Sequence, residues 1–199
     1  MEWAIWAGLA LTAFIIFGGY LSNVLRVKPM PVYGTVPDFS LTNQNGKAVT
    51  LADLRGHIWV ADAIFTRCPS QCLQMTAHMT EIEHTAAPDS VKLVSFTTDP
   101  AFDQPLVLRK YADRFDAIDE RWSFLTGDKS ELHKVEVDGL RLPVLDKPAG
   151  DQQGSNDLFI HSEKFVLIDK QGQIRGYYDG QNPSVVREVV LAAQTLAAE

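Results

Sequence analysis

Residues 57–72 have the sequence HIWVADAIFTRCPSQC, in which an apolar run leads directly into two cysteines. The first nine residues have the length of a buried strand, and Asp62 is the one acidic residue among them. Cys68 and Cys72 are the 2 cysteines of a 199-residue chain, so its thiols are concentrated at one place. Residues 73–85 follow with helical spacing. The stretch therefore predicts a buried strand and a helix with a thiol pair at their junction.

The segments on either side of this unit alternate between strand and helix patterns. Further strands are expected at residues 38–42, 47–51, 91–97, 122–125, 165–169 and 173–178, and further helices at residues 106–115, 130–137 and 184–198. This alternation predicts an α/β fold whose central strands, 57–65 and 91–97, run parallel. Residues 139–157 are rich in Pro, Gly, Asp and Gln and predict a long loop of the kind that is often functional or mobile.

The composition restricts the class of protein. With 46% hydrophobic residues, 18 Lys and Arg, 25 Asp and Glu and a net charge of −7, the chain fits one globular domain and a short appendage. Disordered and disulfide-stapled chains have other compositions. No run of Lys or Arg is longer than two residues, so we expect no nucleic-acid partner.

The amino-terminal segment predicts a membrane anchor. Residues 3–25 are uncharged and would span roughly 35 Å as a helix, against a hydrocarbon core of about 30 Å. No basic region precedes the run, which favours an uncleaved transmembrane helix over a signal peptide. We therefore expect an anchor at residues 1–25, a linker at 26–36 and one domain at 37–199. Arg26 and Lys28 after the span favour a cytoplasmic domain, by a margin of about one charge.

The thiol pair suits redox chemistry or a soft metal ion. A helix N-terminus favours the thiolate, and spacing of four residues places two sulfurs close enough for a disulfide or for one shared metal. Two thiolates favour Cu(I) or Zn(II) and need a further ligand. Two buried structural cysteines are the alternative.

One of the five histidines is the candidate for that ligand. His161 ends the long loop and precedes the strand 165–169, which is expected beside the strand leading to the cysteines. The other four are expected to be solvated or hydrogen-bonded, namely His57, His78, His84 and His133. Met75 and Met79 continue the helical face of the cysteines, where methionines facing the core are the common outcome.

An ordered set of motifs over residues 36–197 resembles the Sco/SenC family of membrane-anchored, thioredoxin-like copper chaperones for cytochrome c oxidase assembly. The motifs are Pro37-Asp38-Phe39 with Asn45-Gly46, Asp53-Leu54-Arg55-Gly56, Phe65 to Cys72, Val94 to Pro100, Tyr111 to Phe115, Leu125-Thr126-Gly127, His161-Ser162 and Leu167 to Gly172. The chain departs from the family pattern at Ser70, at Leu73 and at Ala101-Phe102-Asp103.

The resemblance implies a thioredoxin-like three-layer α/β fold with a central mixed sheet behind one N-terminal transmembrane helix. It implies that Cys68, Cys72 and His161 are ligands of copper, as Cu(I) or Cu(II), and that the two thiols can instead form a disulfide. The partners it implies are a cytochrome c oxidase subunit or its assembly factors and a copper donor protein. The single-pass protein would lie in the cytoplasmic membrane with its domain in the periplasm, against the weak charge bias. Such a protein is a metallochaperone rather than an enzyme.

Asp62 favours a second hypothesis, a membrane-tethered thiol-disulfide oxidoreductase that uses Cys68 and Cys72. It precedes Cys68 by six residues, the offset at which thioredoxins bury an aspartate, and a buried carboxylate there could act as a base. The alternative is an exposed or capping Asp62. Glu163 stands where the thioredoxin proline would be, which favours metal ligation. A peroxidase, whose sequence pattern is incomplete here, and an inactive thioredoxin-like interaction module are weaker alternatives.

Overall fold

A computed structural model describes residues 3, 6, 11–12, 14–18, 29–69, 71–148, 150 and 159–199, with the backbone alone at 160 and 161. The chain divides into two units, residues 30–197 and a unit formed by residues 1–29 with 198–199. Most of the predicted anchor at residues 1–25 lies outside the described residues. Among those described, no helix is both long and apolar enough to cross a membrane.

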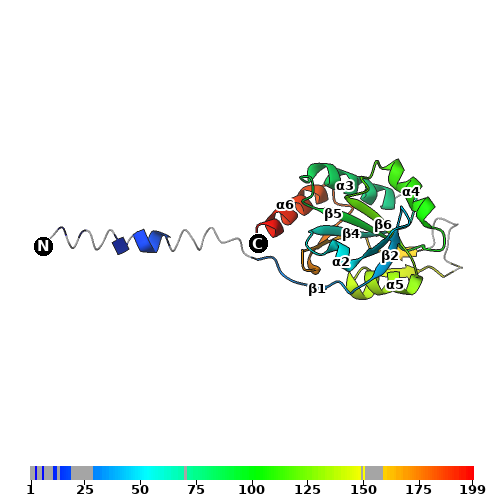
Figure 1. The fold of residues 1–199 in the computed structure, drawn as a ribbon, viewed down its shortest axis with the longest axis horizontal. Helices are drawn as coiled ribbons and strands as arrows, with labels where there is room; N and C mark the ends of the chain where they lie inside the picture. Colours follow the sequence, from blue (N-terminus) through cyan, green and yellow to red (C-terminus); the bar gives the residue numbers. More distant parts are fainter. Residues whose placement is uncertain are drawn as a thin grey trace. The chain divides into compact units, whose positions relative to one another are not determined.

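The larger unit is built on an eight-stranded sheet with the order β1-β10-β9-β4-β5-β6-β2-β3 (Figure 1). Its strands are β1 (Gly34–Thr35), β2 (Ser40–Asn43), β3 (Ala48–Thr50), β4 (Trp59–Ile64), β5 (Lys92–Thr97), β6 (Trp122–Thr126), β9 (Lys164–Ile168) and β10 (Gln173–Asp179). Strands β4 and β5 run parallel, whereas β4 and β9 run antiparallel. The predicted α/β class, the parallel central pair and the mixed sheet are confirmed.

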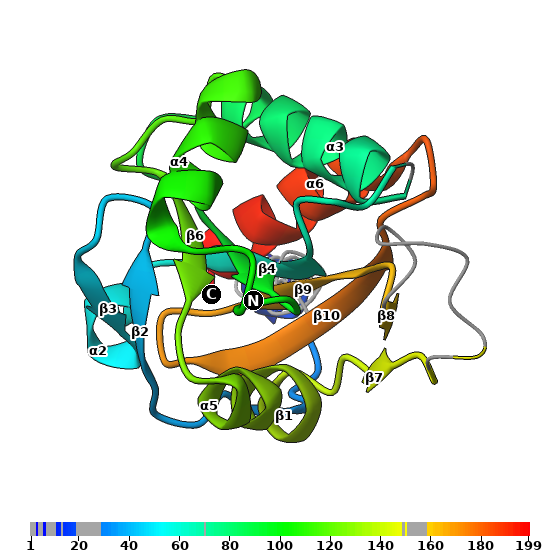
Figure 2. The same cartoon turned by 90° about the vertical axis from the view of Figure 1, so that its right-hand side faces the viewer.

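Helices cover both faces of this sheet. They are α2 (Leu51–Leu54), α3 (Gln71–Thr85), α4 (Pro105–Arg114), α5 (Lys129–His133), the π-helix η1 (Lys134–Gly139) and α6 (Val185–Ala197). Figure 2 shows α3, α4 and α6 on one face and α5 on the other. Side chains alternate across β4, so Val60 and Ile64 pack with the core beneath α3, while Trp59 and Ala61 pack with the opposite core. Burial on both faces explains why this strand is apolar throughout except at Asp62.

Two short strands occur in and after the predicted loop 139–157. Strand β7 (Val144–Asp146) pairs antiparallel with β8 (Phe159–His161), and Val144 lies opposite His161. Strands of three residues, separated by more than ten residues, leave no local periodic signal, so the sequence pattern did not reveal them. The helix predicted at 130–137 is also divided, because α5 continues into the π-helical turn η1.

Residues 30–36, expected within a linker, follow the domain surface. Strand β1 pairs with β10, and the Tyr33 N–H donates to the Ile174 carbonyl at 2.9 Å. Arg175, which is buried, donates from Nη2 to the Met30 carbonyl at 2.8 Å and from Nη1 to Asp169 at 2.8 Å. This attachment gives residues 30–36 defined positions on the sheet.

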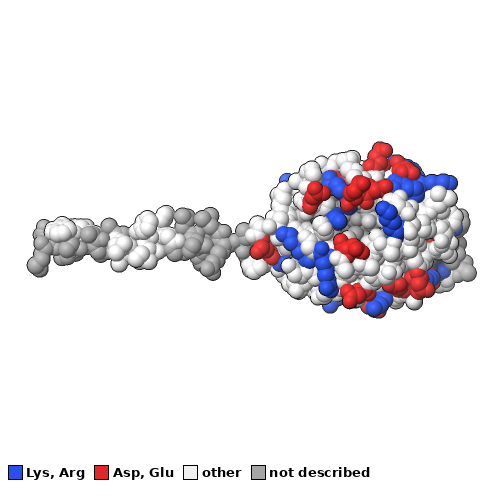
Figure 3. Space-filling model, viewed as in Figure 1, with Lys and Arg blue, Asp and Glu red and all other residues white. Residues whose placement is uncertain are grey.

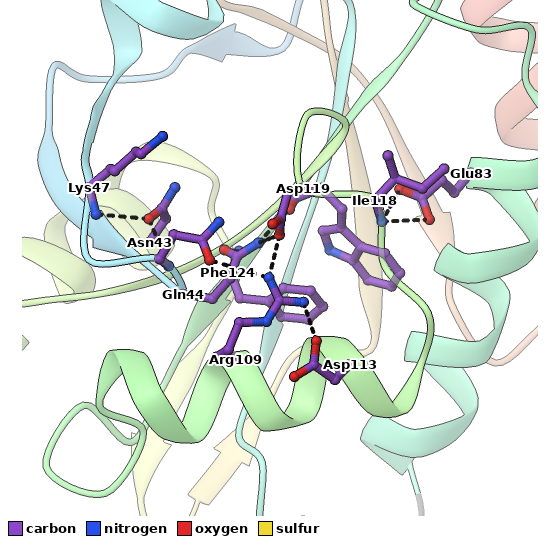
Figure 4. Close-up of polar contacts among 11 residues, drawn as sticks. Asn43, Gln44, Lys47, Glu83, Arg109, Asp113, Ile118, Asp119 and Phe124 are labelled. Carbon is purple, nitrogen blue, oxygen red and sulfur yellow. Dashed lines mark hydrogen bonds and ion pairs between the residues drawn. The ribbon is translucent and has the colours of Figure 1, made fainter.

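A polar cluster holds the turn after β2 against α4 and the segment before β6 (Figure 4). The buried Gln44 side chain donates to the Trp122 carbonyl at 2.9 Å and accepts from the Phe124 N–H at 2.9 Å. Arg109 pairs with Asp113 at 2.6 Å and also with Asp119. The contacts of Gln44 and Arg109 therefore support the β2–β3 hairpin at one edge of the sheet.

Basic and acidic side chains are interspersed over the visible face of the folded domain (Figure 3).

Candidate metal and thiol site

The two cysteines lie where β4 ends and α3 begins. Cys68 is in the turn before the helix, where its N–H donates to the Phe65 carbonyl at 3.1 Å, and Cys72 is the second residue of α3. The Cys72 N–H donates to the Cys68 sulfur at 3.4 Å, and both residues are thiols. Cys68 is 8% exposed and Cys72 is fully buried. Cys68 is therefore the outer thiol of a close pair.

The surroundings of Cys72 oppose its ionisation. A hydrogen bond with Cys68, followed by burial, raises the pKa of Cys72 far above its usual range, and the nearby Asp62 adds to the rise. The sequence argument expected the helix N-terminus to favour thiolates at both positions. At Cys72 the core outweighs that effect, because a charge in apolar surroundings loses its hydration. Cys72 thus keeps its proton unless a metal ion or a disulfide replaces it.

Asp62 lies in the core beneath the thiol pair. It is fully buried in β4, which rules out the exposed alternative, and its charge acts on both Cys72 and Tyr111. The Tyr111 hydroxyl lies 2.8 Å from the Thr76 hydroxyl, which donates to the Cys72 carbonyl at 2.7 Å. Burial raises the pKa of Tyr111. Three polar side chains, those of Asp62, Thr76 and Tyr111, therefore lie within an otherwise apolar core close to Cys72.

The segment after β5 holds the cysteine turn in place. The buried Asp103 accepts from the Thr66 N–H at 3.0 Å, from the Thr66 hydroxyl and from the Thr97 hydroxyl at 2.5 Å. Burial raises the pKa of Asp103, while these hydrogen bonds oppose the rise. Sequence reasoning noted Asp103 only within a departure from the family pattern, because a contact across 37 residues leaves no local signal.

Arg67 makes a second contact between the cysteine turn and the segment after β5. It pairs with Asp99 at 2.5 Å, and its guanidinium lies 4.3 Å from the centre of the Phe102 ring. A cation over an aromatic face is attractive. Phe102, at a position where the chain departs from the family pattern, thus packs beside the cysteine turn.

The backbone of His161 is brought near this turn by β8. In the same strand the Phe159 ring lies edge to face with Phe65, with ring centres 5.4 Å apart. Lys129 of α5 bonds both carboxylate oxygens of Asp146 in β7, at 3.0 and 2.7 Å, and so ties the strand pair to the domain. Among the described side chains, which do not include that of His161, no three His, Cys, Asp or Glu residues form a cluster able to hold a metal.

Comparison with known proteins identifies the family. The SCO1/SenC family model matches residues 29–194, most of the chain. The chain belongs to the SCO1/SenC family. It is 35% identical over 153 residues to a SCO1 protein homolog of Bacillus subtilis (strain 168), covering 75% of this chain and 76% of that protein.

Two solved structures of SCO1/SenC relatives have the same fold. BsSco, described as a member of the Sco family of cytochrome c oxidase assembly proteins with a disulfide switch, is 30% identical with a TM-score of 0.69, covering 86% of this chain and 98% of its own. Bradyrhizobium japonicum ScoI, solved with copper bound, is 23% identical with a TM-score of 0.69, covering 82% and 99%. At that identity the second likeness shows the fold alone.

Three other residues singled out from the sequence have structural roles in this SCO1/SenC domain, namely Met75, Met79 and His78. Met75 and Met79 are fully buried in the core beneath α3, as predicted. The His78 ring nitrogen Nδ1 lies 2.8 Å from the Gly180 carbonyl, so His78 has a structural partner.

Proposed function

We propose that this SCO1/SenC protein binds one copper ion through Cys68, Cys72 and His161. It would deliver copper to a cytochrome c oxidase copper centre or prepare the thiols of that centre. The observation that carries the proposal is the contact of Phe159 with Phe65, since it joins the strand of His161 to the cysteine turn. Membership of the SCO1/SenC family supports the choice of metal, since a protein of the same fold, Bradyrhizobium japonicum ScoI, was solved with copper bound.

The chemistry of these side chains suits copper as cargo. Two thiolates are soft donors that favour Cu(I), and an imidazole completes a three-coordinate site that also accepts Cu(II). Copper must displace the proton of Cys72, whose pKa is raised, so loading releases protons and weakens as the pH falls. The 8% exposure of Cys68 leaves the outer sulfur within reach of an incoming donor or acceptor.

The proposed setting is a membrane anchor at residues 1–25, with the domain in the periplasm. This orientation follows the family resemblance. The charges that flank the span oppose it, because they favour a cytoplasmic domain by a margin of about one charge. The proposed partners are a copper donor and an oxidase subunit or its assembly factors. A protease-accessibility assay that found the domain in the cytoplasm would overturn this orientation.

Anaerobic Cu(I) titration of the reduced protein against a chromophoric competitor tests the ligand set. We expect Cys68→Ala, Cys72→Ala and His161→Ala each to weaken binding at least about tenfold, because a three-coordinate site loses one donor. His78→Ala is the matched control, since that imidazole bonds the Gly180 carbonyl. Binding by His161→Ala that equals the parent, together with fast thiol exchange, would contradict the chaperone proposal.

A thiol-disulfide oxidoreductase is the second candidate, favoured by the burial of Asp62 beneath Cys72. In this reaction the two thiols give two electrons and two protons to a disulfide of a client protein and become a disulfide themselves. Asp62→Asn separates the candidates. Slower exchange with a model disulfide at unchanged copper affinity would assign Asp62 to redox work, whereas unchanged exchange would exclude that role.

A further inference from the structure

A cavity of about 240 Å³ lies between the end of β5, the α5–η1 segment and β7. Neither cysteine lines it. A separate neighbouring cavity of about 300 Å³ shares Thr98, Pro100 and Lys129 with it and is lined by Phe159 of β8. The walls of the smaller cavity include Thr98, Leu132, His133, Glu136, Val144 and Asp146.

Two buried oxygens on these walls lack hydrogen-bond partners among the described residues. Glu136 is 2% exposed, and its Oε1 has no partner; the same is true of the Thr98 Oγ1, at 3% exposure. Buried polar atoms are nearly always paired, because dehydration without a hydrogen bond is costly. Burial raises the pKa of Glu136 well above its usual range. Glu136 also lies on the π-helical turn η1, a feature that occurs often at functional sites.

The charges around the cavity indicate a cationic ligand. Lys129 and Asp146 neutralise each other at 2.7 Å, so this lysine is already paired and does not serve Glu136. The protonated Glu136 carboxyl would release its proton on pairing with an incoming cation. The space is smaller than the roughly 300–1,000 Å³ of most small-molecule sites, and so suits a single side chain. A planar guanidinium offers several N–H donors to two separate oxygens and is more easily dehydrated than an ammonium.

We propose that this cavity receives an arginine side chain of a partner protein, with Glu136 Oε1 and Thr98 Oγ1 as its acceptors. β7 forms one wall and pairs with β8, so the docked arginine lies one strand from His161. A partner held there would lie beside the strand pair that carries His161. The proposal concerns recognition alone and stands whether the site carries copper or exchanges disulfides.

The test titrates the full-length chain with N-acetyl-arginine amide and, separately, with its neutral analogue N-acetyl-citrulline amide. Amide NMR shifts report binding at Thr98, Val144 and Leu145. We expect the arginine probe to bind weakly and the citrulline probe not to bind, because only the former supplies a positive charge. Glu136→Gln should lower affinity for the arginine probe at least about tenfold, since it removes one partner of a buried charge pair.

Asp138→Asn is the matched control, because it makes the same change from acid to amide at an exposed position of the same helical turn. Its affinity for the arginine probe should equal that of the parent. Three outcomes would each overturn the proposal: equal shifts with both probes, shifts away from the cavity, or an unchanged affinity for the arginine probe in Glu136→Gln. The cavity would then be a space filled by water. The comparison of the two probes needs no variant, so the test holds even if Glu136→Gln misfolds.

Discussion

Glu136 and Asp103 are both buried acids, but their surroundings differ. Asp103 accepts hydrogen bonds from Thr66 and Thr97, and these contacts hold the cysteine turn. Glu136 has no hydrogen-bonding residue at Oε1 among the described side chains. A satisfied buried acid stabilises the arrangement around it, whereas an unsatisfied one lowers the stability of the fold.

Replacing Glu136 by Gln is expected to stabilise the protein, and more so as the pH rises. The unfolded carboxyl ionises near its usual pKa of 4.5, while the folded one, with its raised pKa, keeps its proton. Stability is therefore complete below about pH 4.5 and falls as the pH rises through the folded pKa. Gln removes that loss, so the variant should exceed the parent by about 1–3 kcal/mol at neutral pH.

Urea unfolding of both proteins from pH 4 to 8 measures this difference. Asp138→Asn, which changes an exposed acid on the same turn, should show no comparable trend. A difference between Glu136→Gln and the parent that stays constant with pH would show that the carboxyl is not held protonated by burial.

At the scale of elements, the proposed site combines the cysteine turn, which many contacts hold in place, with the β7–β8 pair, which few contacts hold. The cysteine turn is fixed by β4, α3 and the segment after β5. The β7–β8 pair is attached through the Lys129 ion pair, through Val144 on the core beneath α5, and through Phe159 on Phe65. The exposed ion pair contributes little, and the aromatic contact is made by β8 itself, the strand that carries His161.

Phe159→Ala is expected to weaken Cu(I) binding about 3- to 10-fold, because an edge-to-face pair contributes about 0.5–1.5 kcal/mol beyond its buried area. The same variant in a His161→Ala background should cause no further loss, since the strand then carries no ligand. Competition titration measures both. Phe39→Ala, which removes a ring packed edge to face on Phe96 in the opposite core with ring centres 5.7 Å apart, is the control for loss of an aromatic contact elsewhere. Additive losses in the double variant would contradict a positioning role.

At the scale of the whole domain, Arg175 joins the first described residues of the larger unit to its sheet. Its guanidinium bonds Asp169 and the carbonyls of Met30 and Pro31. The pair Arg175–Asp169 is buried on both sides, so each charge depends on the other. Residues 30–36 thereby hold defined positions along the sheet.

Arg175→Met is expected to destabilise the domain by about 3–5 kcal/mol, because it leaves the buried Asp169 charge without its partner. It should also increase proteolysis at residues 29–33. Urea unfolding and limited proteolysis measure the two effects. Arg187→Met, at an exposed position of α6, is the matched control. Parent-like stability in Arg175→Met would show that the ion pair does not hold this segment.

Local patterns were enough to place β4, β5, α3 and α6, because each buries one continuous run or one helical face within a few residues. The cysteine pair was equally visible, since its spacing and its position after a buried strand are properties of one short segment. Asp62 could be either buried or exposed on the sequence alone, and the raised pKa of Cys72, the β7–β8 pair and the cavity at Glu136 left no local signal. Each depends on groups that the fold brings together from distant segments, and burial, which sets both ionisation and unmet hydrogen bonds, exists only once those segments have packed.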